Sequence, residues 1–350
     1  MATFDITQLE ETVISSSLFG KIVLLYGTNR TGKTMVASQL FPGRTLLVAT
    51  EKGYNAIGGV RKVDIDSWGD FRVVVAQLTG KKKKEAARKM YDCVVVDVAD
   101  RLPNLCNQYI CQQMDVDNLS DVPYGGGYAA LNKEFDTQVN KLALSGYCVI
   151  LICHDEFKVF NADTKDEYEM IIPKNTFSKA GNCLKDIPDF NIYLEPNGVD
   201  DEGHVILSTG HTALHKNKFF AGGRFPECPE KIDPFTAENL KETIKIACER
   251  RAEALGVPCV DYAVVEEKNQ SEESSKKVTL SEMKNKIDPV FRKLLKEGYK
   301  ESIQAIVERF LGEGGKVSKA TESDLKKLQF IYDKLVDFAE ENDVDWEESE

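Results

Sequence analysis

The sequence predicts an α/β protein in which a mostly parallel central sheet is flanked by helices and followed by a small C-terminal helical appendage. Short runs rich in Val and Ile alternate with segments of helical periodicity, which is typical of a parallel sheet buried between helices. Of the 350 residues, 42% are hydrophobic and 29% are charged, a globular composition that excludes wholesale disorder. No run approaches the ~18 consecutive apolar residues that cross a bilayer, so no membrane partner is expected.

The strands and helices of the core follow from these runs in order. Buried strands are predicted over 21–26, 45–49, 93–96 and 147–153, with helices over 35–40, 99–114 and 126–145. Two later strands, 189–195 and 204–208, are expected to be antiparallel because the segment between them is too short for a helical crossover. A helix over about 234–255 closes the core.

The domain organisation is read from changes in composition. We expect an α/β core over 1–260, a flexible linker over 261–278, a small helical domain over 279–340 and an acidic tail over 341–350. The linker prediction rests on residues 266–277, which contain no apolar side chain. The last helix is expected to run from Ser323, a suitable N-cap residue, to Ala339.

Charge and cysteines limit the possible environments. The formal charge is −12, and eight acids after residue 335 account for two thirds of it, so the rest of the chain is close to neutral. Overall acidity therefore does not exclude nucleic acid, whose binding depends on local basic surface. The nine cysteines include no Cys-x-x-Cys pair, and the N-terminus lacks a basic region leading into an apolar one. Both features favour reduced thiols in the cytoplasm.

One motif decides the class of site. Residues 27–34 read Gly-x-x-x-x-Gly-Lys-Thr between a predicted strand and a predicted helix, the context of a phosphate-binding loop. Backbone N–H groups of such a loop surround phosphates, and side chains at the glycine positions would crowd that approach. Lys33 can reach the β- and γ-phosphates, and the Thr34 hydroxyl can coordinate Mg²⁺. The motif predicts an ATP and Mg²⁺ site formed by Gly27, Thr28, Asn29, Arg30, Thr31, Gly32, Lys33 and Thr34.

Three polar residues at strand ends extend this site. Asp97 ends the strand 93–96 and is expected to hold Mg²⁺, although it could instead cap the helix that follows. Glu51 follows the strand 45–49 and can orient water toward the γ-phosphate, although it could be an ordinary surface glutamate. His154 follows the strand 147–153 and can sense the γ-phosphate, or it could be purely structural.

In this order of features the chain resembles the RecA-type recombinase ATPases, and most closely the compact RecA-like proteins of phage recombination modules. The resemblance covers about residues 15–255, and a phage origin would place the protein in the host cytoplasm. RecA proteins carry a Lys-x-Lys motif where this chain has Lys216-Asn217-Lys218. The resemblance implies that Lys216 and Lys218, with Arg224 as a further candidate, reach the ATP of a neighbouring subunit in a ring or filament. RecA usually has glutamine where this chain has His154.

The resemblance also implies two loops that contact DNA. The candidates are 118–128, where glycines would give mobility and tyrosines could stack on bases, and 155–181, where lysines alternate with aromatics. Either segment could instead be an ordinary surface loop. We therefore expect an ATP-hydrolysing protein that binds single-stranded DNA and promotes annealing or strand pairing.

Two other functions stay open. One is an ATP-gated replication accessory factor or helicase-related module, in which nucleotide controls partner or DNA binding. The other is a small-molecule kinase, which is disfavoured because no arginine-rich lid is evident. A protein partner could bind the C-terminal helical segment or the acidic tail.

Overall fold

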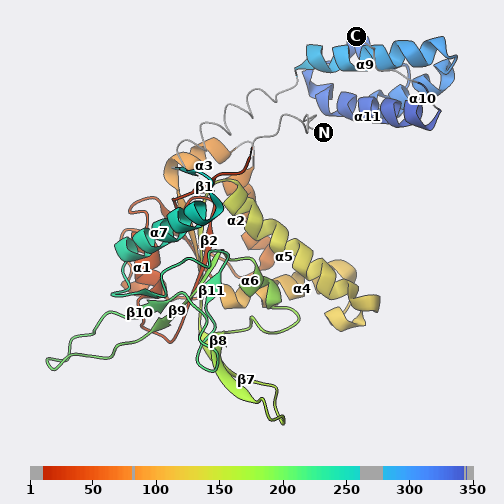
Figure 1. Ribbon diagram of the computed structural model, residues 1–350. Helices are drawn as coiled ribbons and strands as arrows, with labels where there is room; N and C mark the ends of the chain where they lie inside the picture. Colours follow the sequence, from red (N-terminus) through yellow and green to blue (C-terminus); the bar gives the residue numbers. More distant parts are fainter. Residues whose placement is uncertain (1–10, 81–82, 261–278, 343, 345–350) are drawn as a thin grey trace. The chain divides into compact units, whose positions relative to one another are not determined.

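The computed structural model describes residues 11–80, 83–260, 279–342 and 344. Contacts divide these residues into two compact units, one within 12–260 and one within 279–344, and each is described by itself (Figure 1). None of the helices in the described ranges is long and apolar enough to cross a membrane.

The core unit is built on a nine-stranded sheet with the order β12-β10-β9-β2-β6-β5-β3-β4, and β11 pairs with β9. The strands β2, β3, β4, β5, β6 and β9 run parallel, and the short β10, β11 and β12 run antiparallel. The strands are β2 Ile22–Tyr26, β3 Thr45–Ala49, β4 Arg61–Asp64, β5 Cys93–Asp97, β6 Cys148–Cys153, β9 Phe190–Glu195, β10 Thr209–His211, β11 Gly222–Gly223 and β12 Lys231–Ile232. Every residue of β2, β3, β5 and β6 is buried, which confirms the predicted fold class.

Helices cover both faces of this sheet (Figure 1). Leu24 and Tyr26 of β2 pack against α2, α4 and α5, whereas Val23 and Leu25 pack toward α1 and α7. The helices of the core unit are α1 Lys33–Gln39, α2 Trp68–Thr79, α3 Lys84–Met90, α4 Leu102–Met114, α5 Gly126–Leu144, α6 Asn182–Asp186 and α7 Ala237–Leu255. Two further pairs lie outside the main sheet: β1 Ile14–Ser15 with β13 Cys259–Val260, and β7 Asp155–Phe160 with β8 Tyr168–Pro173.

The late strand expected over 204–208 was wrong. The antiparallel strand is β10, which begins at Thr209, and residue 205 only forms an isolated bridge with Val199. Val205, Ile206 and Leu207 are exposed, so this apolar run has no neighbouring sheet to cover it. Several elements were not predicted. Among them are α2 with its Ser67 capping box, the hairpin strands β7 and β8, and β4, whose sequence Arg-Lys-Val-Asp is too polar to read as a buried strand.

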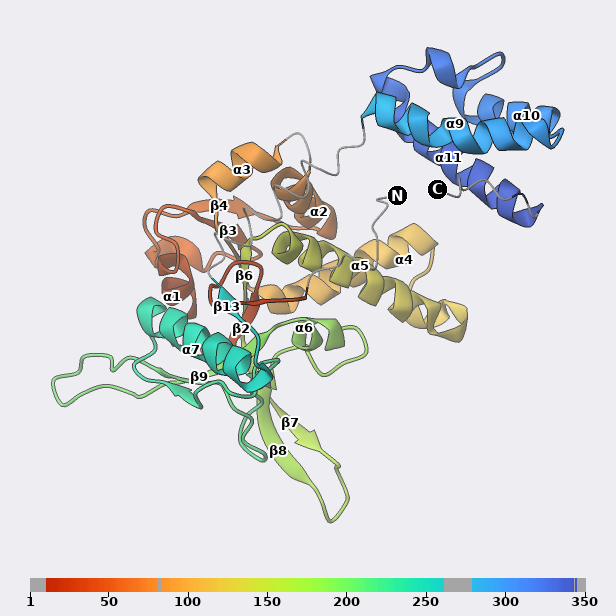
Figure 2. The ribbon, with the colours of Figure 1, turned by 45° about the horizontal axis from the view of Figure 1, so that its top comes forward.

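Both expected DNA loops contain regular structure. Residues 118–128 form two 3₁₀ turns and the first residues of α5. A Cβ at Gly127 would lie 2.4 Å from the carbonyl oxygen of Leu119, so this glycine serves close packing, whereas one at Gly125 would meet no atom within 4 Å. Residues 155–173 form the antiparallel hairpin β7–β8, which projects from the core unit (Figure 2).

The helical unit packs α9 Leu280–Lys296, α10 Lys300–Leu311 and α11 Leu325–Glu341 around one apolar centre. Ser323 is not the N-cap before α11, because a capping box between Thr321 and Asp324 begins that segment two residues earlier. The predicted linker 261–278 and the tail residues 343 and 345–350 lie outside the described residues.

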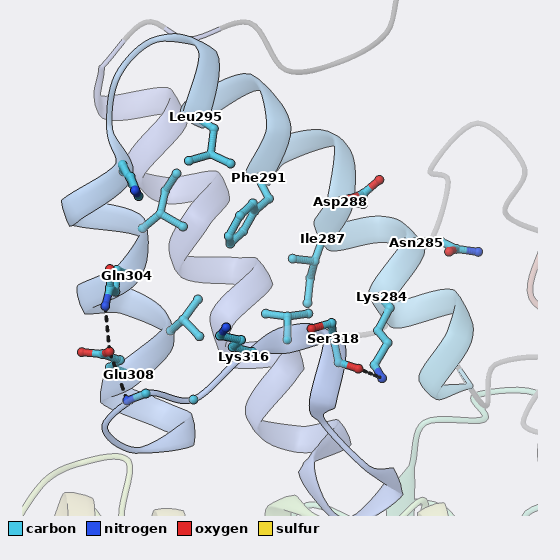
Figure 3. Close-up of a pocket in the computed structure, with 16 residues that line it drawn as sticks. Lys284, Asn285, Ile287, Asp288, Phe291, Leu295, Gln304, Glu308, Lys316 and Ser318 are labelled. Carbon is cyan, nitrogen blue, oxygen red and sulfur yellow. Dashed lines mark hydrogen bonds between the residues drawn. The ribbon is translucent and has the colours of Figure 1, made fainter.

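A cleft of about 840 Å³ lies between α9, α10 and the segment 314–318 (Figure 3). Ile287, Phe291 and Val307 are among its apolar lining residues, and Lys284, Lys300 and Lys316 line it as well. The ammonium group of Lys284 donates to the carbonyl oxygens of Ser318 and Ala320, which fixes one end of the cleft.

Candidate nucleotide site

The phosphate-binding loop joins β2 to α1 at the carboxyl end of the parallel strands. Gly32 has φ 86°, a left-handed conformation that favours glycine. A Cβ at Gly27 would lie 2.5 Å from the carbonyl oxygen of Leu194 in β9, whereas one at Gly32 would meet no atom within 4 Å. Backbone geometry at Gly32 and packing on β9 at Gly27 each favour glycine, in addition to the close approach of phosphates that we expect there.

Lys33 lies inside this loop. Its ammonium group donates to the carbonyl oxygens of Gly27 and Thr28, both at 2.7 Å, and to the hydroxyl of Thr31 at 3.3 Å. Burial lowers the pKa of Lys33, and the nearby carboxylates of Asp155 and Asp97 oppose that effect. Thr28, Asn29 and Arg30 are exposed on the outer side of the loop. A phosphate that binds in the loop would therefore replace the loop carbonyl oxygens as the hydrogen-bond acceptor of the Lys33 ammonium group.

Thr34 and Asp97 meet beside this lysine. The Thr34 hydroxyl donates to Asp97 Oδ2 at 2.9 Å, and burial raises the pKa of Asp97. The alternative role of Asp97 as a helix cap was wrong, because Val98 is the N-cap residue of the 3₁₀ turn that follows. A hydroxyl and a carboxylate are the oxygen donors that Mg²⁺ takes alongside phosphate oxygens, so these residues fit that ion.

Glu51 is positioned by the residue before it. The Thr50 hydroxyl accepts from the backbone N–H of Val98 at 3.0 Å and donates to its carbonyl at 2.9 Å, which ties the end of β3 to the end of β5. The Glu51 side chain is 39% exposed, and its charge contributes to raising the pKa of Asp97. The structure therefore places Glu51 next to the expected metal ligand.

His154 connects two carboxylates. Its Nδ1 lies 2.9 Å from Asp100 Oδ2, its backbone N–H donates to the same oxygen at 2.8 Å, and its Nε2 lies 3.9 Å from Glu51 Oε1. The hydrogen bond to Asp100 raises the pKa of His154. Because Asp100 is almost fully buried, at 4% side-chain exposure, it fixes the ring so that Nε2 faces Glu51.

Asp100 was missed from the sequence. It lies one 3₁₀ turn after Asp97, next to the end of β6, and the available signal was a second carboxylate three residues beyond the strand end. Its carbonyl oxygen accepts from Asn175 Nδ2 at 3.1 Å, and the backbone N–H of Lys174 donates to the carbonyl of His154 at 2.9 Å. Asp100 and His154 thus anchor the base of the β7–β8 hairpin.

Lys216 and Lys218 lie on an exposed turn elsewhere in the core unit. The turn follows the edge of β8, because the N–H of Ile171 donates to the carbonyl of Lys218 at 2.8 Å. Within the described ranges, neither lysine side chain forms a hydrogen bond or ion pair with the nucleotide-site residues. Arg224 pairs with Asp189 at 3.2 Å and remains largely exposed.

Comparison with known proteins agrees with this site. Residues 20–225 match the AAA domain family. The chain is also 33% identical over 341 residues to the SPbeta prophage-derived uncharacterized protein YorG of Bacillus subtilis strain 168. The aligned residues cover 96% of this chain and 99% of that protein. The chain therefore belongs to the AAA domain family, with a P-loop ATPase-like domain as its core.

Proposed function

We propose that this protein is a phage-type, RecA-like ATPase of the host cytoplasm that binds single-stranded DNA and promotes annealing or strand pairing. The observation that supports this most is the connection through His154. The imidazole lies between Glu51 at the nucleotide site and Asp100, which anchors the hairpin expected to contact DNA. Nucleotide and DNA would therefore act on one hydrogen-bonded element.

The nucleotide-site residues have separate roles in this proposal. Lys33 binds the β- and γ-phosphates, Thr34 and Asp97 hold Mg²⁺, and Glu51 orients the attacking water. Bound Mg²⁺ would neutralise charge that develops on the phosphate oxygens. His154 keeps its Nε2 directed at the Glu51 carboxylate and responds to the γ-phosphate.

The hairpin is suited to single-stranded DNA. Phe157 is 75% exposed at an outward position of β7, and Phe160 stacks on Tyr168 with ring centroids 5.1 Å apart. Lys158 and Lys216 lie against this aromatic pair, 6.0 Å from the Phe160 centroid and 5.8 Å from that of Tyr168. Exposed aromatics beside lysines can bind unstacked bases and a phosphate backbone together. Tyr124, fully exposed in the segment 118–128, adds a second stacking position.

We also propose that the active assembly is a ring or filament. Lys216 and Lys218 would then contact the nucleotide of a neighbouring subunit, because both residues are exposed on one turn; Lys216 would leave the Tyr168 ring to do so.

A second function, the ATP-gated accessory factor, is favoured by the cleft of the helical unit. Its apolar lining beside Lys300 and Lys316 suits a protein segment that carries apolar and acidic side chains (Figure 3). In that case nucleotide would control partner binding, and DNA would change the ATPase rate little.

The deciding experiment is the ATPase rate of the full chain with and without single-stranded DNA. The proposal expects several-fold stimulation, a roughly 10²–10³-fold loss in Lys33→Ala, and a comparable loss of kcat with retained ATP binding in Glu51→Gln. Lys62→Ala, at an exposed surface ion pair, is the control that should behave like the wild type. Hydrolysis without any response to DNA would support the accessory factor, and absence of hydrolysis in a folded wild-type chain would exclude the ATPase proposal.

A further inference from the structure

A self-paired ribbon extends from one end of the core sheet. Residues 196–208 leave β9, turn back and enter β10, and they reach away from the core unit (Figures 1 and 2). The backbone N–H of Ile206 donates to the carbonyl of Gly198 at 3.0 Å, and that of Asp200 to the carbonyl of His204 at 2.9 Å. The ribbon is therefore preformed, which lowers the conformational cost of docking it.

This ribbon exposes apolar side chains that nothing in the described core unit covers. The exposed fractions are 74% for Val205, 52% for Leu207, 60% for Val199 and 43% for Ile206. Several large apolar residues gathered on one projecting segment are characteristic of a binding surface, whereas single exposed apolar residues are ordinary.

A receiving pocket lies at the opposite end of the sheet. A cavity of about 320 Å³ is formed by α1, the turn before β3 and the segment before β4. Its apolar lining includes Met35, Pro42, Ile57 and Val60, and Met35 is 51% exposed. The ribbon follows β9 near one edge of the strand order, and the pocket is lined by residues just before β3 and β4, the strands at the other edge.

The charges of the two surfaces are complementary. The ribbon tip carries Asp200, Asp201 and Glu202, and the Nδ1 atom of His204 lies 3.2 Å from Asp200 and 3.6 Å from Glu202. Three carboxylates beside one imidazole keep the tip acidic, which disfavours a nucleic-acid partner. Arg61 comes directly after the lining residue Val60 in the sequence. Its guanidinium group donates to the carbonyl oxygen of Gly43, another lining residue, at 2.8 Å. In the described part of the chain no carboxylate pairs with Arg61, so an acidic tip can supply its counter-charge.

We propose that the 196–208 ribbon of one molecule docks in the α1–β4 pocket of a second copy of this chain. Two different surfaces at opposite ends of one unit make a head-to-tail contact, which builds rings or filaments. The inference rests on the proposed function and deepens it, because α1 begins at Lys33. A ribbon docked on α1 would bring the neighbouring chain, with its Lys216–Lys218 turn after β10, toward the nucleotide site.

The test is sedimentation velocity of the full chain with Mg²⁺ and a non-hydrolysable ATP analogue. Leu207→Asp damages the ribbon, and Met35→Glu damages the pocket on an exposed helix position that accepts glutamate. Each variant alone should need at least tenfold more protein to assemble. A head-to-tail contact makes a sharper prediction for their equimolar mixture: one intact ribbon meets one intact pocket, so dimers form and growth stops there.

Leu144→Asp is the matched control, because Leu144 is 87% exposed at the end of α5 and belongs to neither the ribbon nor the pocket lining, so its replacement should leave assembly unchanged. Should Met35→Glu not fold, Leu207→Asp added to wild type must shorten the assemblies by capping one end. If wild type and Leu207→Asp assemble equally well, the ribbon–pocket contact is overturned and the proposed function is not affected. Wild type that stays monomeric under all conditions also overturns the shared-site part of the proposed function.

Discussion

Asp100 is the residue on which the arrangement of the site depends most. One buried oxygen accepts from both the backbone and the imidazole of His154, so ring orientation and charge are set together. Because this bond raises the pKa of His154, the pair stabilises the fold fully below the ordinary histidine pKa. That contribution is lost as the pH rises through the raised value.

We expect Asp100→Asn to lower the pKa of His154, because the amide oxygen still accepts but carries no charge. An NMR titration of the His154 ring should therefore move toward acid relative to wild type. The free energy of unfolding should differ more between the two proteins at pH 5 than at pH 8. Asp200→Asn, which removes the partner of exposed His204, is the control. An unchanged His154 titration in Asp100→Asn would contradict this account.

At the same scale, Gly127 allows close packing of the backbone, whereas the sequence analysis expected the glycines of this segment to give mobility. A glycine run signals either freedom or close approach, and only the placement of Leu119 against α5 distinguishes them. We expect Gly127→Ala to destabilise the core by about 1–3 kcal/mol, because backbone would have to move. Urea unfolding measures this. Gly58→Ala, whose new Cβ would meet nothing within 4 Å, should change the unfolding free energy little.

At the scale of elements, the sequence was informative where burial was complete. β2, β3, β5 and β6 are buried throughout and apolar except at Thr45 and Asp97. Their carboxyl ends carry the loop, Glu51, Asp97 and His154, so both the strands and their neighbouring ends were predictable. β4 lies at the sheet edge with one half-buried residue, and the 204–208 run is apolar yet exposed. An apolar pattern therefore predicts a strand only where the fold also buries it. β4 is a strand at the sheet edge without being apolar, and the 204–208 run is apolar without being buried.

The hairpin β7–β8 gives the element-scale prediction. Phe157 is 75% exposed, and no ring among the described residues packs against it, so it contributes little to folding and is available to a base. We expect Phe157→Ala to weaken single-stranded DNA binding by about 1–3 kcal/mol, roughly 5- to 150-fold, at fixed salt. Fluorescence anisotropy with a labelled oligonucleotide measures it. Val73→Ala, an exposed apolar position on α2, should bind like wild type, and equal losses in both variants would argue against the hairpin.

For the whole molecule, the site described here is incomplete if its last cations come from a second chain. Within one chain, Lys33, Glu51, Asp97 and His154 converge, whereas Lys216 and Lys218 lie on an exposed turn beside β8. No single-chain pattern can reveal which surface of a neighbour meets them, because the relevant spacing exists only between molecules. The motif Lys-x-Lys therefore predicted the residue type, and the location of its target stays a prediction.

Mixing two inactive variants tests this directly. Lys33→Ala has a defective loop but intact lysines on the exposed turn, and the double variant Lys216→Ala/Lys218→Ala has the reverse. A trans-acting cation can contribute roughly 10³–10⁵ in rate, so each variant alone should hydrolyse ATP very slowly. In a mixed assembly some intact loops meet intact lysines, and the ATPase rate should recover to a measurable fraction of wild type. Recovery should fail when the double variant also carries Met35→Glu, because its pocket could no longer receive a ribbon. A mixture as inactive as its components, while still co-assembling, would show that the lysines act within their own chain or not at all.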